Sequence, residues 1–254
     1  MEGQVIEERT SELKLDNNRA APPGWGNDRI TAFLGSAYQN TWATFHNMKG
    51  AYSHLNSIEG LYQKATTLLD NKPEAIIPIA LFFRAHSAFL TGAGLSMAGQ
   101  LREAYSVLRG CLEDALYAWH IDRTPGLAEV WLKRDDDEKS RKRSKIVMRS
   151  LLEKLKTTNP AIGESVEKLY ERTIDYGGHP NKMAVLSNMR LIRDGDGRRF
   201  DTAYLNSDSV PLQLALKTSA QVGIAALLVF DMVFKTRFEL ASLSKEIAVA
   251  KRGL

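Results

Sequence analysis

Cysteine is nearly absent from this chain, since Cys111 is the only one in 254 residues. An intrachain disulfide is therefore excluded, and the composition fits a reducing compartment such as the cytoplasm. Residues Met1–Arg9 are acidic and polar, so we expect no secretory signal. The most apolar run, Val222–Phe234, is interrupted by Asp231 and is shorter than the about 20 apolar residues that a span needs. We expect a buried core helix there and no membrane association.

Motifs for cofactors and metals are also missing. The chain has no P-loop, no Gly-x-Gly-x-x-Gly and no Gly-x-Ser-x-Gly element. Glu-x-x-His does not occur, and His46 and His54 are eight positions apart, which is the wrong spacing for a helical metal pair. We therefore expect neither a metal nor a cofactor.

The excess of positive charge is small. The 34 lysines and arginines outnumber the 30 acidic residues to give a net charge of +4, which allows phosphate contacts without requiring them. Hydrophobic residues make up 44% of the chain and charged residues 25%, as in an average globular protein. A core of ordinary size can therefore be buried.

Helical periodicity covers most of the chain. Apolar residues recur at steps of three and four from Asp28 onward, and clusters of Gly, Pro, Asn and Asp interrupt the pattern. The Asp-Gly-Asp-Gly sequence at 194–197 predicts the turn of a small hairpin. The predicted helices lie at 28–68 (broken near Gly50 or Gly60), 73–121 (broken at the glycines 92–99, with Pro73 in its first turn), 127–132, a segment ending at 155, 161–174 and 209–250, with the hairpin at 190–200.

The predicted fold is all-α, an up-and-down helical bundle with at most one small β-hairpin. Residues 1–27 show neither helical nor strand periodicity and are predicted to form a flexible N-terminal arm. A single helical domain is predicted over 28–254. The predicted core includes eight apolar residues: Leu108, Leu112, Leu116, Trp119, Ile224, Leu227, Leu228 and Phe230.

One segment suggests chemistry, the stretch Arg172-Thr-Ile-Asp-Tyr-Gly-Gly-His179-Pro-Asn. A helix ends at the Gly-Gly pair, and His179 follows at once. Imidazole is a natural proton shuttle at cellular pH, and the planar, charged fork of Arg172 suits a phosphate. Together they can cleave RNA without a metal. His179 takes the proton of a ribose 2′-hydroxyl, and Arg172 neutralises the charge that develops on the phosphoryl group.

The same residues also fit an ordinary helix end. In that interpretation His179 caps carbonyl groups, and Arg172 pairs with Asp175 or Glu171. Spacing alone does not separate the two interpretations.

Two motifs together resemble the HEPN-like superfamily of small helical bundles, which is defined by an Arg-x4–6-His motif. The helix Ala104–Glu113 carries Arg109 and Glu113 in the Arg-x-x-x-Glu spacing of HEPN-like proteins, and Tyr176–Asn181 is similar to their segment ending in His-Pro-Ser. The resemblance covers roughly residues 73–188. The second motif position of active members is typically Asn, Asp or His, whereas Thr173 stands here.

This resemblance implies a function. Active members are metal-independent endoribonucleases, often dimeric, of toxin–antitoxin, abortive-infection and related phage-defence or mobile-element systems, and many others are inactive binding scaffolds. We expect a candidate endoribonuclease with Arg172 and His179 as catalytic residues, or alternatively a non-catalytic binding or structural subunit. The expected partners are an RNA substrate, a second copy of the chain and a protein partner such as an antitoxin, and the expected location is cytoplasmic.

Further residues are predicted to support this site. Arg109 and Glu113 share one helix face with apolar neighbours, which indicates a partly buried pair that either fixes packing or orients His179. Asp175 and Tyr176 lie within the motif itself. Four arginines flank the predicted hairpin turn, where they either contact RNA or are solvated: Arg190, Arg193, Arg198 and Arg199.

Overall fold

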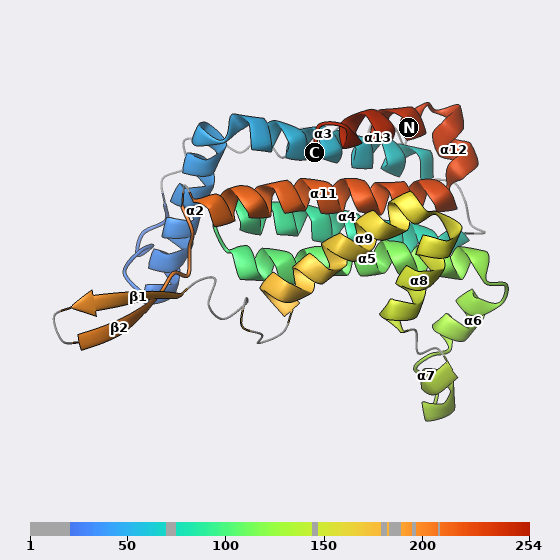
Figure 1. Ribbon diagram of the computed structural model, residues 1–254, viewed down its shortest axis with the longest axis horizontal. Coiled ribbons are helices and arrows are strands. Elements are labelled where there is room, and N and C mark those ends of the chain that lie inside the picture. Colours follow the sequence, from blue (N-terminus) through green and yellow to red (C-terminus); the bar gives the residue numbers. More distant parts are fainter. Residues whose placement is uncertain are drawn as a thin grey trace. The chain divides into compact units, whose positions relative to one another are not determined.

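A computed structural model describes residues 21–69, 75–143, 147–178, 182, 189–194, 197–207 and 209–254. The helices are α2 (Arg29–Asn47), α3 (Lys49–Leu69), α4 (Ile76–Met97), α5 (Leu101–Arg123), α6 (Leu127–Leu132), α7 (Glu138–Arg143), α8 (Met148–Thr158), α9 (Pro160–Thr173), α11 (Val210–Val233), α12 (Lys235–Leu240) and α13 (Leu243–Lys251). A π-helical turn, η2 (Ile174–Gly178), continues α9 (Figure 1). The predicted all-α class is confirmed.

The described residues fall into two compact units that divide between Ser36 and Ala37, within α2. In the first unit, Asp28 caps the start of α2, because its Oδ1 accepts hydrogen bonds from the main-chain nitrogens of Ile30 and Thr31 at 2.9 and 3.0 Å. Most of the predicted arm lies outside the described residues. The predicted division into an arm at 1–27 and a domain at 28–254 stays a prediction.

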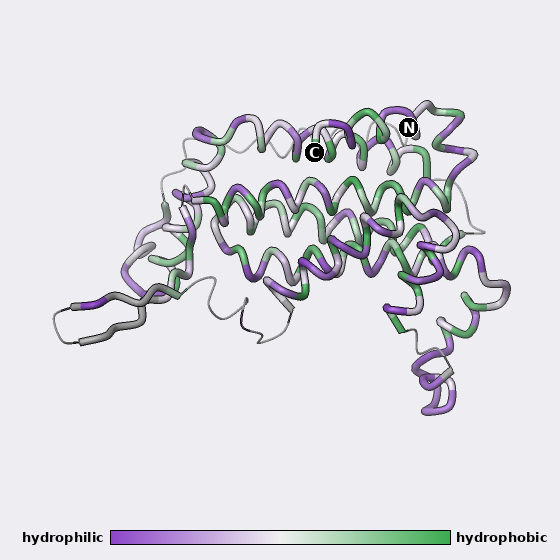
Figure 2. The backbone as a smooth tube through the Cα atoms, viewed as in Figure 1, coloured by the Kyte–Doolittle hydropathy of each residue, from purple (hydrophilic) through white to green (hydrophobic). Residues whose placement is uncertain are grey.

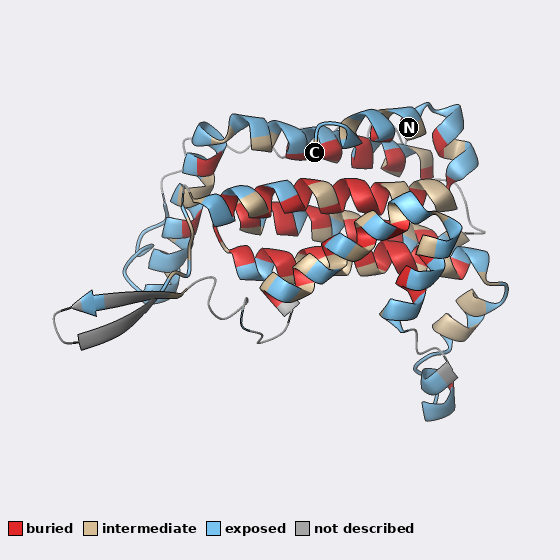
Figure 3. Cartoon of the chain, viewed as in Figure 1, coloured by how far each residue is buried: buried red, intermediate tan, exposed pale blue. Residues whose placement is uncertain are grey.

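The second unit is a helical bundle arranged around α11. This helix packs against α3, α4, α5, α9 and α13, and its buried residues continue along its length (Figures 1 and 3). The tube coloured by hydropathy shows the same apolar character along α4 and α11 (Figure 2). Seven of the eight predicted core residues are buried, and Leu228 is half-buried. The core therefore lies where the apolar periodicity places it.

Two of these helices, α4 and α11, are long and apolar enough to cross a membrane by length and composition alone. The most apolar window of α11 is 72% buried, which is typical of a core helix, and that of α4 is 44% buried. The expectation that the chain has no membrane association stays a prediction.

Strands occur in one antiparallel hairpin among the described residues. β1 (Met189–Asp194) pairs with β2 (Gly197–Thr202), with Asp194 opposite Gly197. The hairpin predicted from the Asp-Gly-Asp-Gly turn is confirmed, and it begins one residue earlier and ends two residues later than predicted.

Three helix breaks differ from the prediction. The break predicted across the glycines 92–99 falls at residues 98–100, because α4 continues through Gly92 and Gly94 to Met97. The first long helix breaks at Met48 rather than at Gly50 or Gly60, both of which lie inside α3. The last predicted helix, 209–250, is three helices, because the chain turns at Phe234 and again at Ser242, which adopts a left-handed φ of 60°. These turns bring α13 back against α3 and α11. Pro73, predicted to begin a helix, lies outside the described residues.

A buried polar cluster joins four helices inside the apolar core. The hydroxyl of Tyr62 on α3 lies 3.7 Å from the thiol of Cys111 on α5 and donates to the main-chain oxygen of Gly223 on α11 at 3.3 Å. The ring of Tyr62 stacks on that of His86 on α4, whose Nε2 is 2.7 Å from Oε2 of Glu59. Burial raises the pKa of Cys111 to about 12.

Gly223 permits the close approach of α11 to α3 and α4. A methyl group there would lie 2.7 Å from Cε2 of Phe89 and 2.9 Å from Cγ2 of Ile58. Both neighbours are at most 1% exposed, so neither has space to move.

We expect Gly223→Ala to lower the free energy of unfolding by about 1–3 kcal/mol, because the added methyl group overpacks the core. Gly110→Ala is the matched control, since a methyl group at Gly110 would meet nothing within 4 Å. In a helix interior that change stabilises by up to about 1 kcal/mol. Urea unfolding of the two variants measures the difference, and equal stabilities would contradict this account of the α11 packing.

Candidate anion-binding site

The end of α9 is held tightly against α5. Asn159 caps the start of α9 by accepting a hydrogen bond from Ile162 N at 3.2 Å, and the helix runs into the π-helical turn η2. A methyl group at Gly177 would lie 2.6 Å from Ser106 N, and the Ser106 hydroxyl donates to Gly177 O at 2.6 Å. Gly177 therefore allows backbone contact with α5. The α-helix ends at Thr173, before the Gly-Gly pair where its end was predicted, and the π-helical turn runs through both glycines. Single π turns are uncommon and occur often at functional sites.

Arg172, on the last turn of α9, faces α11. Its Nη1 donates to Oγ1 of Thr218 at 3.2 Å and to Oε1 of Gln221 at 2.9 Å. The predicted alternative in which Arg172 pairs with Asp175 or Glu171 is wrong, because α11 packs beside α9 and supplies neutral acceptors instead. Among the described residues no carboxylate pairs with Arg172, so its positive charge is oriented without being neutralised.

Tyr105 extends this network into the core. Its hydroxyl lies near that of Thr218, which is fully buried. Burial raises the pKa of Tyr105, while the nearby Thr218 hydroxyl and the charge of Arg172 act in the opposite direction. The ring of Tyr176, from η2, stacks on that of Tyr105 with centroids 5.3 Å apart. α5, α9, η2 and α11 therefore meet at one polar cluster.

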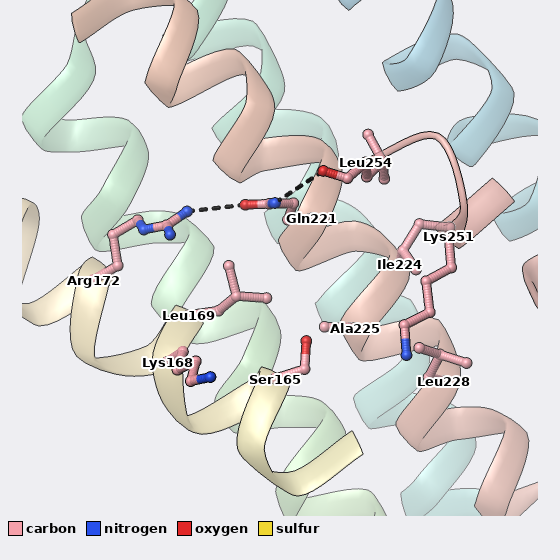
Figure 4. A pocket seen from close by; sticks show the side chains of 10 residues that line it. All are labelled: Ser165, Lys168, Leu169, Arg172, Gln221, Ile224, Ala225, Leu228, Lys251 and Leu254. Atoms are coloured by element: carbon pink, nitrogen blue, oxygen red, sulfur yellow. Dashed lines mark hydrogen bonds between the residues drawn. The ribbon is translucent and has the colours of Figure 1, made fainter. Parts of the chain in front are cut away.

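A pocket of about 250 Å³ opens beside Arg172, between α9, α11 and the end of the chain. Figure 4 shows a line of hydrogen bonds along it, from Arg172 to Gln221 and from Gln221 Nε2 to the main-chain oxygen of Leu254 at 3.3 Å. Lys168 and Lys251 add two exposed ammonium groups. The remaining lining residues are Ser165, Leu169, Ile224, Ala225 and Leu228.

The chemistry of this pocket suits an anion with an apolar portion. Three cationic side chains line it, and no acidic side chain of the described residues does. Guanidinium and ammonium groups are the usual protein partners of phosphate, and Arg172 is already oriented by α11. The apolar wall formed by Leu169 and Ile224 keeps water from one side of the pocket, which strengthens its electrostatic interactions.

The other predicted catalytic residue, His179, lies outside the described residues. Asp175 is exposed, and Tyr176 is half-buried against Tyr105. Of the four hairpin arginines, Arg193 is exposed and lies opposite Arg198 in the strand register. The side chains of three lie outside the described part of the chain: Arg190, Arg198 and Arg199.

Arg109 and Glu113 form an ion pair of 3.5 Å on α5, with exposed side-chain fractions of 28% and 36%. Glu113 also accepts a hydrogen bond of 3.0 Å from the hydroxyl of Tyr170 on α9, two residues before Arg172. Burial, followed by the charge of Glu113, raises the pKa of Tyr170 to about 12. The pair is therefore partly solvated and links α5 to the helix that carries Arg172.

Sequence reasoning missed several residues of the pocket. Lys168 lies one helical turn before Arg172, so their shared face was available as a signal from the spacing alone. Thr218 and Gln221 are 46 and 49 positions away from Arg172, and no local pattern connects them with it.

No family model, curated protein or solved structure matches the chain. The resemblance to the HEPN-like superfamily therefore stays a prediction. Within the part of the chain that the structure describes, no three His, Cys, Asp or Glu side chains gather as a metal ion would require.

We expect Glu113→Ala to lower the free energy of unfolding by about 1 kcal/mol, because it removes a partly solvated ion pair and one hydrogen bond. Glu113→Gln keeps an oxygen for the Tyr170 hydroxyl and should lose less. Urea unfolding at pH 7 compares the variants. A loss above about 3 kcal/mol would indicate a buried pair of the kind that the sequence suggested.

Proposed function

We propose that the pocket beside Arg172 binds a phosphate group of RNA, and that the chain is a metal-independent endoribonuclease of the HEPN-like kind. The observation that supports this proposal is the guanidinium of Arg172, which α11 orients by two hydrogen bonds and which no described carboxylate neutralises. Lys168 and Lys251 line the same pocket and increase its attraction for a phosphodiester.

The reaction needs one general base, which accepts a proton, and one cation. His179 takes the proton of a ribose 2′-hydroxyl, and the resulting oxygen attacks the adjacent phosphorus. Arg172 stabilises the charge that builds up on the phosphoryl oxygens. The bond from phosphorus to the 5′-oxygen then breaks, and that oxygen leaves after taking up a proton. The products are a 2′,3′-cyclic phosphate and a 5′-hydroxyl.

Other predicted features belong to the same proposal. Asp175 and Tyr176 lie within the motif, beside the site. We expect the hairpin arginines to contact the RNA strand. A homodimer, a protein partner such as an antitoxin, a role in phage defence or a mobile element, and a cytoplasmic location stay predictions.

The second candidate function is a non-catalytic binding or structural subunit. Two observations favour it. Nη1 of Arg172 ties α9 to α11, which is a structural role in itself. Thr173, at the motif position where active HEPN-like members carry Asn, Asp or His, is fully buried and donates to the main-chain oxygen of Tyr170 at 2.7 Å. Its hydroxyl therefore has no access to a substrate.

Cleavage of total RNA in the presence of a chelator separates the two functions. We expect the wild-type chain to cleave, and His179→Ala and Arg172→Ala each to reduce the rate by on the order of 100-fold or more, because the base or the charge stabilisation is lost. Product ends should carry a 2′,3′-cyclic phosphate.

Arg29→Ala is the control for loss of charge, since Arg29 is exposed at the start of α2. It should cleave at the wild-type rate. Equal background cleavage by wild type and His179→Ala would reject the endoribonuclease and favour the binding subunit.

A further inference from the structure

A second pocket lies on the other side of the Arg172 network. It has a volume of about 260 Å³ and is bounded by the first turns of α5 and α11 and by η2. Its walls are mainly apolar or aromatic, and the exposed Arg102 adds a cation at the edge. The lining residues are Leu101, Arg102, Tyr105, Tyr176, Val210, Pro211 and Leu214.

The two pockets follow each other along the same pair of elements. α9 and η2 contribute Arg172 to the first pocket and Tyr176 to the second, while α11 contributes Gln221 to the first and Leu214 to the second. Thr218 lies between them, accepts a hydrogen bond from Arg172 and is near Tyr105. Leu214 and Gln221, one from each pocket, are two helical turns, about 10 Å, apart along α11. An extended ligand can therefore reach both pockets.

The two pockets differ in the chemistry of the side chains that line them. The first presents three cations, whereas the second presents the stacked rings of Tyr105 and Tyr176 beside aliphatic side chains. Tyr105 is only 3% exposed and supports the half-buried Tyr176 from behind. Phosphates bind to cations, and nucleobases stack on aromatic rings. Neighbouring cationic and aromatic pockets therefore match the phosphate and the base of a nucleotide.

We propose that the pocket of Tyr176 and Leu214 holds a nucleobase of the same RNA strand whose phosphate Arg172 binds. This inference rests on the proposed function, and it names the part of the substrate that the second pocket recognises. The ligand is single-stranded at this position, because a base paired in a helix has no free face to stack on Tyr176.

The test is binding of a short single-stranded 2′-O-methyl RNA and of an abasic oligomer with the same backbone. Neither has a free 2′-hydroxyl that could act as the nucleophile, so neither is cleaved. Fluorescence anisotropy measures both affinities. We expect the wild type to bind the base-bearing oligomer about tenfold or more tightly than the abasic one. Arg172→Gln should weaken binding of both oligomers alike.

Two variants remove the base pocket in opposite ways. Tyr176→Leu deletes the stacking ring, and Leu214→Trp fills the space while leaving Tyr176 in place. Each should abolish the preference for the base-bearing oligomer, whereas Tyr176→Phe should keep it. Leu240→Trp is the matched control for an added tryptophan, because Leu240 on α12 is 83% exposed and belongs to neither pocket, and it should bind as the wild type does.

The outcomes separate the two proposals. Equal wild-type affinity for both oligomers, together with weaker binding by Arg172→Gln, would overturn the base pocket and leave the phosphate site intact. Absence of binding to either oligomer would overturn the proposed function, and the base pocket with it. A preference for bases that survives in Leu214→Trp would show that the base binds elsewhere.

Discussion

Burial of α11 is the constraint on which the rest of the bundle depends. Helices α3, α4, α5, α9 and α13 pack around it, and Gly223 lets α3 and α4 approach its backbone closely. A helix enclosed in this way offers few positions at which a polar side chain can be kept. Two of them, Thr218 and Gln221, are the partners of Arg172. The same packing that forms the core therefore also selects which groups face α9.

The candidate site follows from this arrangement. Arg172 would be a flexible surface side chain on an isolated α9, with much rotational freedom to lose on binding an anion. Two hydrogen bonds to α11 restrict that freedom before any ligand arrives, which reduces the entropy lost on binding. Buried Tyr105 lies near Thr218 and also lines the aromatic pocket. Charge and stacking surface are thus positioned by one short network.

The sequence predicts the helices well and the site only in part. Apolar periodicity predicts α5 and α9 because each buries one continuous face, whereas the Gly-Gly pair lies in the π-helical turn that follows α9 and does not mark its end. The turns at Phe234 and Ser242 were missed, because neither residue is a typical helix breaker and the apolar pattern continues across them. The partners of Arg172 were missed because they lie 46 and 49 positions away, and only the packing of α9 on α11 brings them together. Local sequence patterns carry no information about contacts between residues that lie so far apart in the chain.

The burial of Cys111 has a practical consequence. Its thiol is fully buried beside Tyr62, and a pKa of about 12 keeps it protonated at neutral pH. Thiolates, not thiols, react with maleimides and similar reagents. Because Cys111 is the only cysteine, the native chain already serves as a background for site-directed labelling. A cysteine introduced on the exposed part of β1 or at the edge of either pocket would carry a single dye or spin label without any prior cysteine replacement.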